Sequence, residues 1–331
     1  MLASRQGLSS TDTLQNAPTP PPTASQSEGA CARSDTPPSC IGCAWTVPPA
    51  RLLAIIPRVS TSSPFDTKDY WEKRFASSTD LSTVGYAGLG KPFNQWMYRL
   101  RRRVFLRTVT PLAADVDLNT VLDVGSGSGF YIDRWHELRA GDIRACDITD
   151  VAVHRLRSKY PQHEVTVLDV SSESDDLPAW QVDAISAFDI TFHIVSDTRL
   201  RQAFVNMFSL LRPGGLLIFT DNFVQSTATH ASHHVSRTKT TLEGAVHAAG
   251  FEIVSRKPAF FFMNQPVDTD SALHRRSWEI MTSTLRRWPT TGYLFGPLLF
   301  PIDLTLVKLL SEGPSTEIMV CRKPADKRAK I

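Results

Sequence analysis

The sequence predicts an α/β protein whose core is a doubly wound, mostly parallel sheet of seven strands with helices on both faces. From residue 120 onward, short apolar strands alternate with helical segments, which is the pattern of a parallel sheet with helical crossovers. The strands are nearly continuous apolar runs, as expected of a sheet buried on both faces. Apolar residues make up 42% of the 331 positions and charged residues 21%, which fits a globular protein, and a net charge of +3 is too small to indicate nucleic acid.

Residues 1–62 differ in composition from the rest and are expected to be a disordered extension. Nine of the 22 prolines fall in the first 60 residues, among Ser, Thr, Ala and Gln, and this composition cannot bury a core. The stretch is rich in hydroxyl residues and poor in acids, like an organelle transit peptide, but a dispensable N-terminal segment would have the same composition. The expected location of the protein is cytoplasmic. Cys40 and Cys43 have the spacing of half a zinc site without further ligands nearby, so no metal site is expected.

Residues 63–331 are expected to form one domain. Its expected parts are an N-terminal helical cap (63–118), a cofactor-binding core (119–263), a helical lid inserted before the last strand (264–313), and the last strand with a basic tail (314–331). The inserted segment is far longer than an ordinary connection between strands, and insertions of this length often cover a ligand.

The individual elements follow from the apolar pattern. The expected strands are 120–124, 143–147, 165–169, 183–188, 216–221, 251–262 and 315–323. The expected helices are 69–76, an arginine-rich one at 94–109, and those near 128–139, 150–159, 197–212 and 239–249, followed by one or two in the insertion. The longest apolar run, 293–310, is interrupted by prolines and charged residues, which argues against a membrane span.

The stretch VLDVGSGSGF, Val121 to Phe130, places three glycines directly after the first core strand. It lacks the spacing G-x-G-x-x-G of a dinucleotide fingerprint, and the chain has no phosphate-binding G-x-x-x-x-G-K-[ST]. Acids end or follow the first four core strands: Asp123, Asp147, Asp169 and Asp189. Carboxylates at the ligand-binding edge of the sheet suit a cationic, hydroxylated ligand without phosphate, and S-adenosylmethionine has these properties.

The segment 120–222 resembles the core of class I S-adenosylmethionine-dependent methyltransferases, of the small-molecule type. The resemblance rests on VLDVGSGSG, on Asp147 at 24 positions after Asp123, on LDVS, on FDITFHI and on LLRPGGLLIFTD, in this order. It implies a Rossmann-like fold, ribose binding by Asp147, and adenine contact by Asp169 with Val170 beside the ring.

The same resemblance assigns further residues to the cofactor site. It places the glycine loop (Gly125, Ser126, Gly127 and Gly129) against the methionine and ribose parts of the cofactor, with Asp123 orienting the loop and the ammonium group. Ile148 and Phe188 are expected beside these residues. Tyr70, Trp71 and Arg74 resemble a helix before the core that covers the cofactor, although packing against the core explains them equally well.

The loop after the fourth strand, FDITFH, is expected to face the transferred methyl group. Asp189 and His193 are its candidate catalytic residues, and His193 is the candidate general base because the pKa of imidazole suits neutral pH. The alternative is that His193 only lines the pocket. The loop lacks the [DNS]-P-P-[YF] motif of amino-group methylation and the Pro-Cys pair of cytosine methylation. The expected acceptor is therefore a small, partly apolar molecule methylated on oxygen, with carbon or nitrogen left open.

Two other functions remain open from the sequence. One is a cofactor-binding scaffold or regulatory protein without catalysis. The other is methylation of RNA or of a membrane-associated lipid, which the arginines of RLRRRVFLR and the basic tail favour, although such a helix more often presents a solvated basic face. The sequence argues against nucleic acid in general, leaves contact with a membrane surface open and does not indicate the oligomeric state.

Overall fold

The structure is a computed structural model that describes residues 66–77, 85–225, 229–230 and 233–325. All of these belong to a unit that spans Ser62–Ile331. The predicted disordered extension and the Cys40–Cys43 pair lie outside the described residues.

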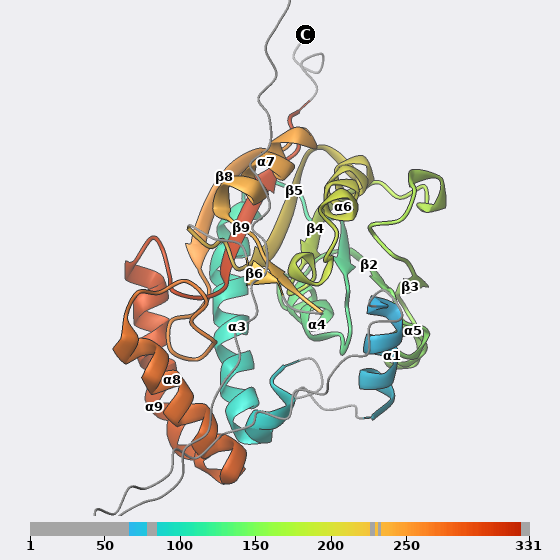
Figure 1. The fold of residues 1–331 in the computed structure, drawn as a ribbon. Helices are drawn as coiled ribbons and strands as arrows, with labels where there is room; N and C mark the ends of the chain where they lie inside the picture. The colour runs from blue at the N-terminus through green and yellow to red at the C-terminus, as the bar shows by residue number, and fades with distance from the viewer. Residues whose placement is uncertain (1–65, 78–84, 226–228, 231–232, 326–331) are drawn as a thin grey trace, which may run out of the picture. The chain divides into compact units, whose positions relative to one another are not determined.

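Seven strands form one sheet, in the order β3-β2-β1-β4-β5-β9-β8 (Figure 1). Their bounds are β1 Thr120–Val124, β2 Asp142–Asp147, β3 Glu164–Val167, β4 Val182–Ala187, β5 Leu211–Asp221, β8 Glu252–Pro258 and β9 Glu317–Arg322. Only β9 runs antiparallel to its neighbours β5 and β8. A small second sheet pairs β6 Thr229–His230 with β7 Val235–Ser236. The predicted doubly wound, mostly parallel seven-stranded sheet is confirmed, and its arrangement is Rossmann-like.

The helices of the unit lie close to their predicted positions. They are α1 Thr67–Ser77, α3 Gly90–Leu112, α4 Phe130–Glu137, α5 Asp150–Lys159, α6 Asp197–Leu210, α7 Lys239–Ala248, α8 Ala272–Arg287 and α9 Gly292–Leu309. Short 3-10 turns are η1 Ala87–Leu89, η2 Ser174–Asp176, η3 Thr191–His193 and η4 Pro289–Thr291. Four helices begin after a Ser or Thr whose side chain accepts a backbone N–H of the first turn: Thr149, Ser196, Thr238 and Ser271. Such caps satisfy donors that the helix itself leaves free.

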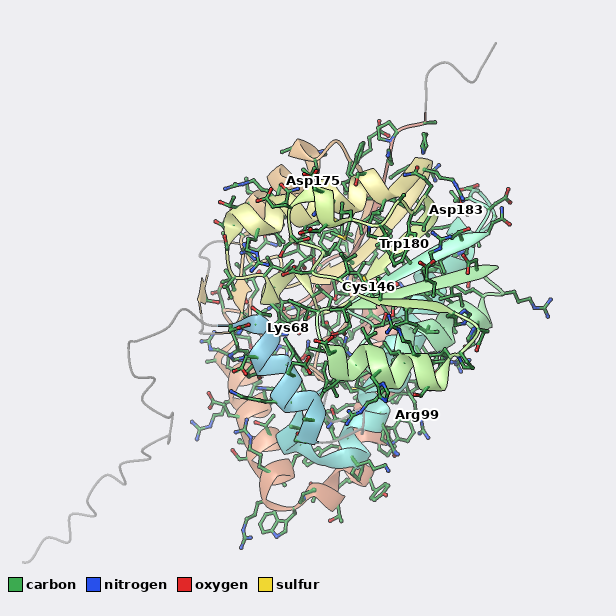
Figure 2. All side chains as sticks on the ribbon, turned by 90° about the vertical axis from the view of Figure 1, so that its right-hand side faces the viewer. Lys68, Arg99, Cys146, Asp175, Trp180 and Asp183 are labelled. Carbon is green, nitrogen blue, oxygen red and sulfur yellow. The ribbon has the colours of Figure 1, made fainter. Side chains whose placement is uncertain are left out.

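The sheet is buried on both faces by two separate apolar clusters. One face packs against α3, α4 and α5, together with residues of α8 and α9, and the other packs against α6 and α7. Cys146, near the end of β2, is completely buried in the cluster that packs against α6 and α7 (Figure 2). Burial raises the pKa of its thiol, which makes Cys146 a poor nucleophile.

The insertion before the last strand forms α8 and α9, and α9 lies beside α3 (Figure 1). The two helices approach closely because α9 has glycines in the contact: a Cβ at Gly296 would lie 2.2 Å from the ring of Trp96. The helix continues through Pro297 and Pro301, where the sequence had predicted interruptions. Both prolines are exposed, so water can satisfy the carbonyls that they leave without a helical donor.

Strand β8 ends at Pro258, earlier than the predicted residue 262, because the following backbone bonds to α9 instead of to a strand. The backbone N–H groups of Phe261, Phe262 and Met263 donate to the Asp303 carboxylate at 2.9 to 3.1 Å. Asp303 itself is completely buried. This carboxylate therefore connects the insertion to the end of the sheet.

One helical stretch of the described residues, Pro289–Leu309, is long and apolar enough to cross a membrane when only its length and composition are considered. Within the unit it packs against α3, and 22% of its most apolar window is buried.

We expect Asp303→Ala to lower the free energy of unfolding by about 3 kcal/mol, because three buried N–H donors lose their acceptor. Urea unfolding followed by circular dichroism measures the change. Glu279→Ala, at an exposed position of α8, is the matched control and should change stability little. Equal stability of the two variants would contradict the structural role of Asp303.

Candidate active site

The glycine loop lies across the ends of β1 and β2. Gly125 and Gly129 have left-handed φ angles of +67° and +78°, which favour glycine, and a Cβ at Gly129 would lie 2.6 Å from the ring of Tyr160. The N–H groups of Gly125 and Ser126 both donate to the Cys146 carbonyl at the end of β2, at 2.8 and 3.0 Å. These two bonds anchor the start of the loop at the end of β2.

Asp147 lies at the carboxyl end of β2 and is tied to this loop. One carboxylate oxygen accepts from the Gly127 N–H at 2.9 Å, and the other accepts from the Thr149 N–H and hydroxyl at 3.0 and 2.7 Å. Burial raises the pKa of this carboxyl group, and the three hydrogen bonds oppose the increase. Hydrogen bonds fix the carboxylate, while the oxygen that faces Gly127 keeps a second acceptor position for a ligand hydroxyl.

A cavity of about 130 Å³ opens beside Asp147, and we call it the cofactor cavity. Of the predicted cofactor residues, those that line it are Trp71, Gly125, Gly127, Asp147, Ile148, Asp169, Val170 and Phe188. The predicted residues that do not line it are Tyr70, Arg74, Asp123, Ser126 and Gly129.

Asp169 follows β3 and is held in place from two sides. One carboxylate oxygen accepts from the Ser171 N–H at 2.9 Å and from its hydroxyl at 2.6 Å, and the other pairs with Arg199 of α6. The sequence had indicated Asp169 but not Arg199, since the two residues lie 30 positions apart. A ligand amine at this position would share the carboxylate with the guanidinium.

Asp123 is nearly completely buried under the glycine loop. One carboxylate oxygen accepts from the Ser186 hydroxyl at 2.6 Å, and Ser186 in turn accepts from the indole N–H of Trp135 at 2.9 Å. The other oxygen, Oδ2, has no donor among the residues that the structure describes. Burial raises the pKa of this carboxyl group to about 7. An acceptor without a donor beneath a loop of backbone N–H groups fits a cationic ligand group nearby.

Helix α1 covers the cofactor cavity with Thr67, Trp71 and Phe75. It is fixed to α5 because the Glu72 carboxylate accepts from the Asp150 N–H at 2.6 Å, at the start of that helix. Helix α1 thus lies over the cofactor cavity, and only Trp71 of the predicted set Tyr70, Trp71 and Arg74 lines it.

The other two predicted residues of α1 point elsewhere. The Arg74 guanidinium donates to the Gly85 carbonyl at 2.7 Å and to the Tyr70 hydroxyl at 3.0 Å. The ring of Tyr70 stacks on His233, with 5.5 Å between the ring centres. Arg74 lines the neighbouring cavity, and Tyr70 lines neither of the two.

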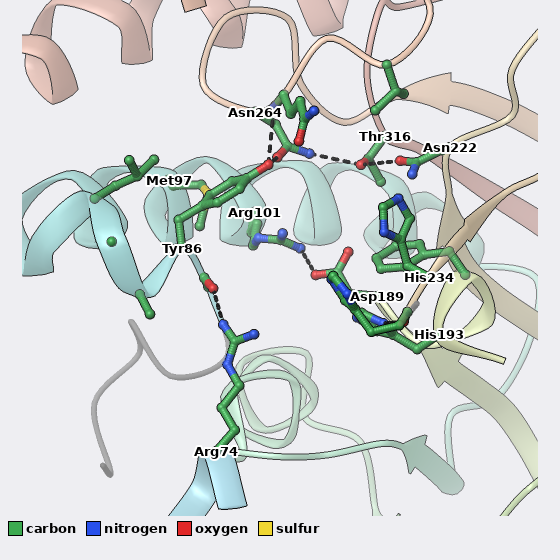
Figure 3. A pocket seen from close by; sticks show the side chains of 18 of the residues that line it. Arg74, Tyr86, Met97, Arg101, Asp189, His193, Asn222, His234, Asn264 and Thr316 are labelled. Atoms are coloured by element: carbon green, nitrogen blue, oxygen red, sulfur yellow. Dashed lines mark hydrogen bonds and ion pairs between the residues drawn. The ribbon is translucent and has the colours of Figure 1, made fainter. Parts of the chain in front are cut away.

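This neighbouring cavity measures about 390 Å³, and we call it the acceptor cavity (Figure 3). It shares three lining residues with the cofactor cavity, namely Trp71, Asp189 and His193. The two cavities therefore meet at the loop after β4, where the sequence had predicted the reacting groups.

Asp189 pairs with Arg101 of α3 at the boundary of the two cavities (Figure 3). Its backbone has a φ of +59°, unusual for a residue other than glycine, and its N–H donates to the Thr220 hydroxyl at 2.8 Å. Arg101 is only 9% exposed, and its Nε has no acceptor among the described residues. The Asp189 carboxylate thus compensates a buried cation, which leaves it poorly suited to act as a general base.

His193 lies in η3, with its ring between the cavities. Its Nδ1 is 2.8 Å from the backbone carbonyl of His233. A carbonyl can only accept, so Nδ1 carries the proton and Nε2 of the neutral ring is free to accept one. Burial lowers the pKa of His193 to about 4, which keeps the ring neutral at physiological pH. The edge of the Trp71 ring packs against it, with 5.0 Å between centres.

A chain of hydrogen bonds forms one wall of the acceptor cavity, and the sequence did not indicate it. The Tyr86 hydroxyl donates to Asn264 at 2.5 Å, the Asn264 amide donates to Thr316 at 2.9 Å, and the Thr316 hydroxyl donates to Asn222 at 3.0 Å (Figure 3). These residues come from four distant segments, so no local motif joins them.

Arg101 was also missed, although the sequence holds a signal for it. The run RLRRRVFLR was expected to present a solvated basic face or to bind anionic partners. Arg101 instead follows Met97 by four positions, on the same face of the helix as buried Met97 and Phe105. A helical projection of this segment places Arg101 inside.

Residues 121–215 match the family model described as a methyltransferase domain. This segment is a methyltransferase domain. The match confirms the class I methyltransferase core that the sequence predicted, and with it S-adenosylmethionine as the cofactor. The acids at the strand ends that line the cofactor cavity, Asp147, Asp169 and Asp189, fit a cationic, hydroxylated cofactor.

Solved methyltransferases resemble the methyltransferase fold of this chain only distantly. Magnesium protoporphyrin IX methyltransferase from Synechocystis PCC 6803 is 13% identical over 80% of this chain and 100% of its own, with a TM-score of 0.48. The N-methyltransferase NodS from Bradyrhizobium japonicum WM9 is 15% identical over 78% and 98%, with a TM-score of 0.46. No curated protein gives a significant match. These likenesses are too weak to assign a substrate.

We expect Asp147→Ala to weaken S-adenosylmethionine binding to the methyltransferase domain by a factor of about 100, because a buried carboxylate acceptor for the ribose hydroxyls is lost. Calorimetric titration measures the affinity. Asp142→Ala removes an exposed carboxylate at the opposite end of the same strand and is the control. Unchanged affinity in Asp147→Ala, with the fold intact, would contradict the assignment.

Cofactor affinity should also rise with pH through the ionisation of Asp123. Its raised pKa of about 7 means that the group is largely neutral in acid and gains the charge that attracts an ammonium as pH approaches neutrality. Between about pH 5.5 and 7 the affinity should increase about tenfold. Asp123→Asn should flatten this profile, and a slope that persists in the variant would assign the effect to another group.

Proposed function

We propose that this protein transfers the methyl group of S-adenosylmethionine to an oxygen of a small, partly apolar metabolite. The observation that carries the proposal is the meeting of the two cavities at Trp71, Asp189 and His193. Groups bound in the two cavities come nearest to each other at this shared boundary, and such proximity is what a transfer reaction needs.

The size and lining of the acceptor cavity support a metabolite as the acceptor. Its volume of about 390 Å³ lies in the range of small-molecule sites. The apolar side chains of Leu89, Met97 and Phe192 line it together with the guanidinium groups of Arg74, Arg101 and Arg286. This mixture favours an acceptor with an apolar body and a hydroxylated or anionic part.

His193 is the residue that we assign to the acceptor hydroxyl. Its neutral ring keeps Nε2 available as an acceptor, so it can receive a hydrogen bond, or the proton itself, from a hydroxyl in the acceptor cavity. S-adenosylmethionine supplies an activated methyl group when bound. Trp71 of α1 packs against the His193 ring at the boundary between the cavities, and Asp189 keeps the buried Arg101 compensated.

The experiment that tests the proposal combines binding and turnover. Calorimetry should give micromolar affinity for S-adenosylmethionine and for its demethylated product, and no binding of NAD. Metabolites with phenolic, enolic or carboxylic hydroxyls are then incubated with methyl-labelled cofactor and screened for the labelled product. A folded protein that binds neither cofactor form contradicts the proposal. Binding without turnover on any acceptor favours the scaffold alternative.

We expect His193→Ala to lower kcat by a factor of about 100 while the cofactor affinity changes less than threefold, since the general base is lost but the cofactor acids remain. Because the pKa of His193 lies near 4, its protonation should not reduce turnover between about pH 6 and 8. His154→Ala, exposed on α5, is the control. A wild-type rate in His193→Ala would limit this residue to lining the cavity.

A further inference from the structure

Helix α9 exposes an apolar stripe along its outer face. Leu294, Leu298 and Ile302 succeed one another at intervals of four residues and are 66%, 57% and 42% exposed, and Leu309 at the end of the helix is 71% exposed. We propose that this stripe docks the protein onto the surface of an anionic lipid bilayer. Exposed apolar patches of this kind mark interaction sites, and a helix that presents one lies at the interface of a bilayer.

Aromatic residues at the start of the helix support a lipid interface. Trp288 precedes η4 and is 57% exposed, and Tyr293 in the first turn of α9 is 67% exposed. Trp and Tyr favour the boundary between lipid headgroups and acyl chains because their rings have an apolar body and a polar tip. Their position next to the leucine stripe gives this face the composition of an interfacial helix.

The helix lies on the bilayer and does not cross it. Its opposite face holds the buried Asp303, which accepts three backbone N–H groups, and the Val307 carbonyl accepts from Arg107 of α3 at 2.8 Å. Gly292 and Gly296 pack directly against α3. Insertion across a membrane would break these contacts and place a carboxylate in the hydrocarbon.

Arginine side chains flank the stripe. Arg99 and Arg103 are exposed on α3 and precede Arg107 at intervals of four residues, so the three lie on the edge of α3 that borders α9. The guanidinium of Arg99 lies over the Trp96 ring, which contacts Phe300 of α9.

The exposed charged residues at the ends of α8 and α9 are also basic. Arg286 and Arg287 end α8, next to Trp288, and Lys308 is exposed near the end of α9.

Between residues 280 and 311 the only carboxylate is that of Asp303, which is buried. Within this span the exposed charge is positive, which suits anionic lipid headgroups. Exposed carboxylates lie only at its two margins, Glu279 of α8 and Glu312 after α9, and Glu312 pairs with Arg256.

The same charge argues against two other occupants. A second copy of the chain, paired through this face, would bring two positively charged faces together. The apolar segment 51–58 of this chain, RLLAIIPR, carries an arginine at each end and no acid, so it would also place like charges together. An anionic bilayer provides both the apolar layer and the opposite charge.

The docking face borders the acceptor cavity. Arg286, in the last turn of α8, lines that cavity and lies beside the aromatic start of the docking face. A protein held by α9 would thus have its acceptor cavity close to the headgroup layer, where a partly apolar acceptor accumulates. The docking itself depends on the surface alone and not on methyl transfer.

Co-sedimentation of the full chain with vesicles tests this proposal. The protein should sediment with phosphatidylcholine vesicles that contain phosphatidylglycerol, should not sediment with phosphatidylcholine alone, and should be released by salt. Arg99→Gln with Arg103→Gln should weaken binding roughly fivefold for each arginine removed. Leu294→Ser with Leu298→Ser should weaken it by about tenfold or more.

The matched control is Arg201→Gln with Val205→Ser, which removes an exposed arginine and an exposed apolar side chain from α6. It should bind vesicles like the unmodified chain. The proposal is overturned if the chain does not sediment with anionic vesicles. It is overturned as well if the control and the variant Leu294→Ser with Leu298→Ser lose vesicle binding equally. It is also overturned if light scattering shows a dimer that the leucine variant abolishes while vesicle binding is absent.

Discussion

Parallel pairing of β1 with β2 and β4 is the constraint on which the rest of the site depends. In this pairing Asp123 lies opposite Ala145 on one side and Ser186 on the other, so the ends of all three strands reach one edge of the sheet. Asp147, the last residue of β2, and Asp189, two positions after the end of β4, then lie at this edge on either side of β1, although they are far apart in the sequence. Without that shared edge, the glycine loop and the acids would be separate local features.

Because the site is made of strand ends, the sequence could predict a large part of it. Each acid follows an apolar run whose end is visible, and the glycines after the first strand mark the loop. The strands and most helices are therefore found within a few residues of their predicted positions. The remaining part depends on contacts between distant segments: Asn264 accepts from Tyr86 and donates to Thr316, and the three residues are far apart in the sequence.

Buried charge is the physical reason why local patterns misled at two positions. Charged residues are expected outside, so the arginine run suggested a solvated helix face, yet Arg101 lies inside with Asp189 as its partner. Asp303 follows two prolines and precedes a lysine in the apolar helix α9, and the sequence therefore predicted that the apolar run is interrupted there. In the structure Asp303 is buried and accepts three backbone N–H groups. In both cases a distant partner compensates the cost of burial, and that partner cannot be read from neighbouring residues.

The Asp303 contact also joins the apolar outer helix α9 to the polar wall of the acceptor cavity. The backbone it holds ends at Met263, and the next residue, Asn264, bonds to Tyr86 in the wall of the acceptor cavity. A displacement of α9 therefore reaches that wall through a single peptide unit. If one ligand binds at α9 and another in the acceptor cavity, and each moves this backbone, each changes the affinity for the other. The factor of change is the same for both ligands. Helix α9 and the wall of the acceptor cavity are therefore mechanically linked through Asp303 and Asn264.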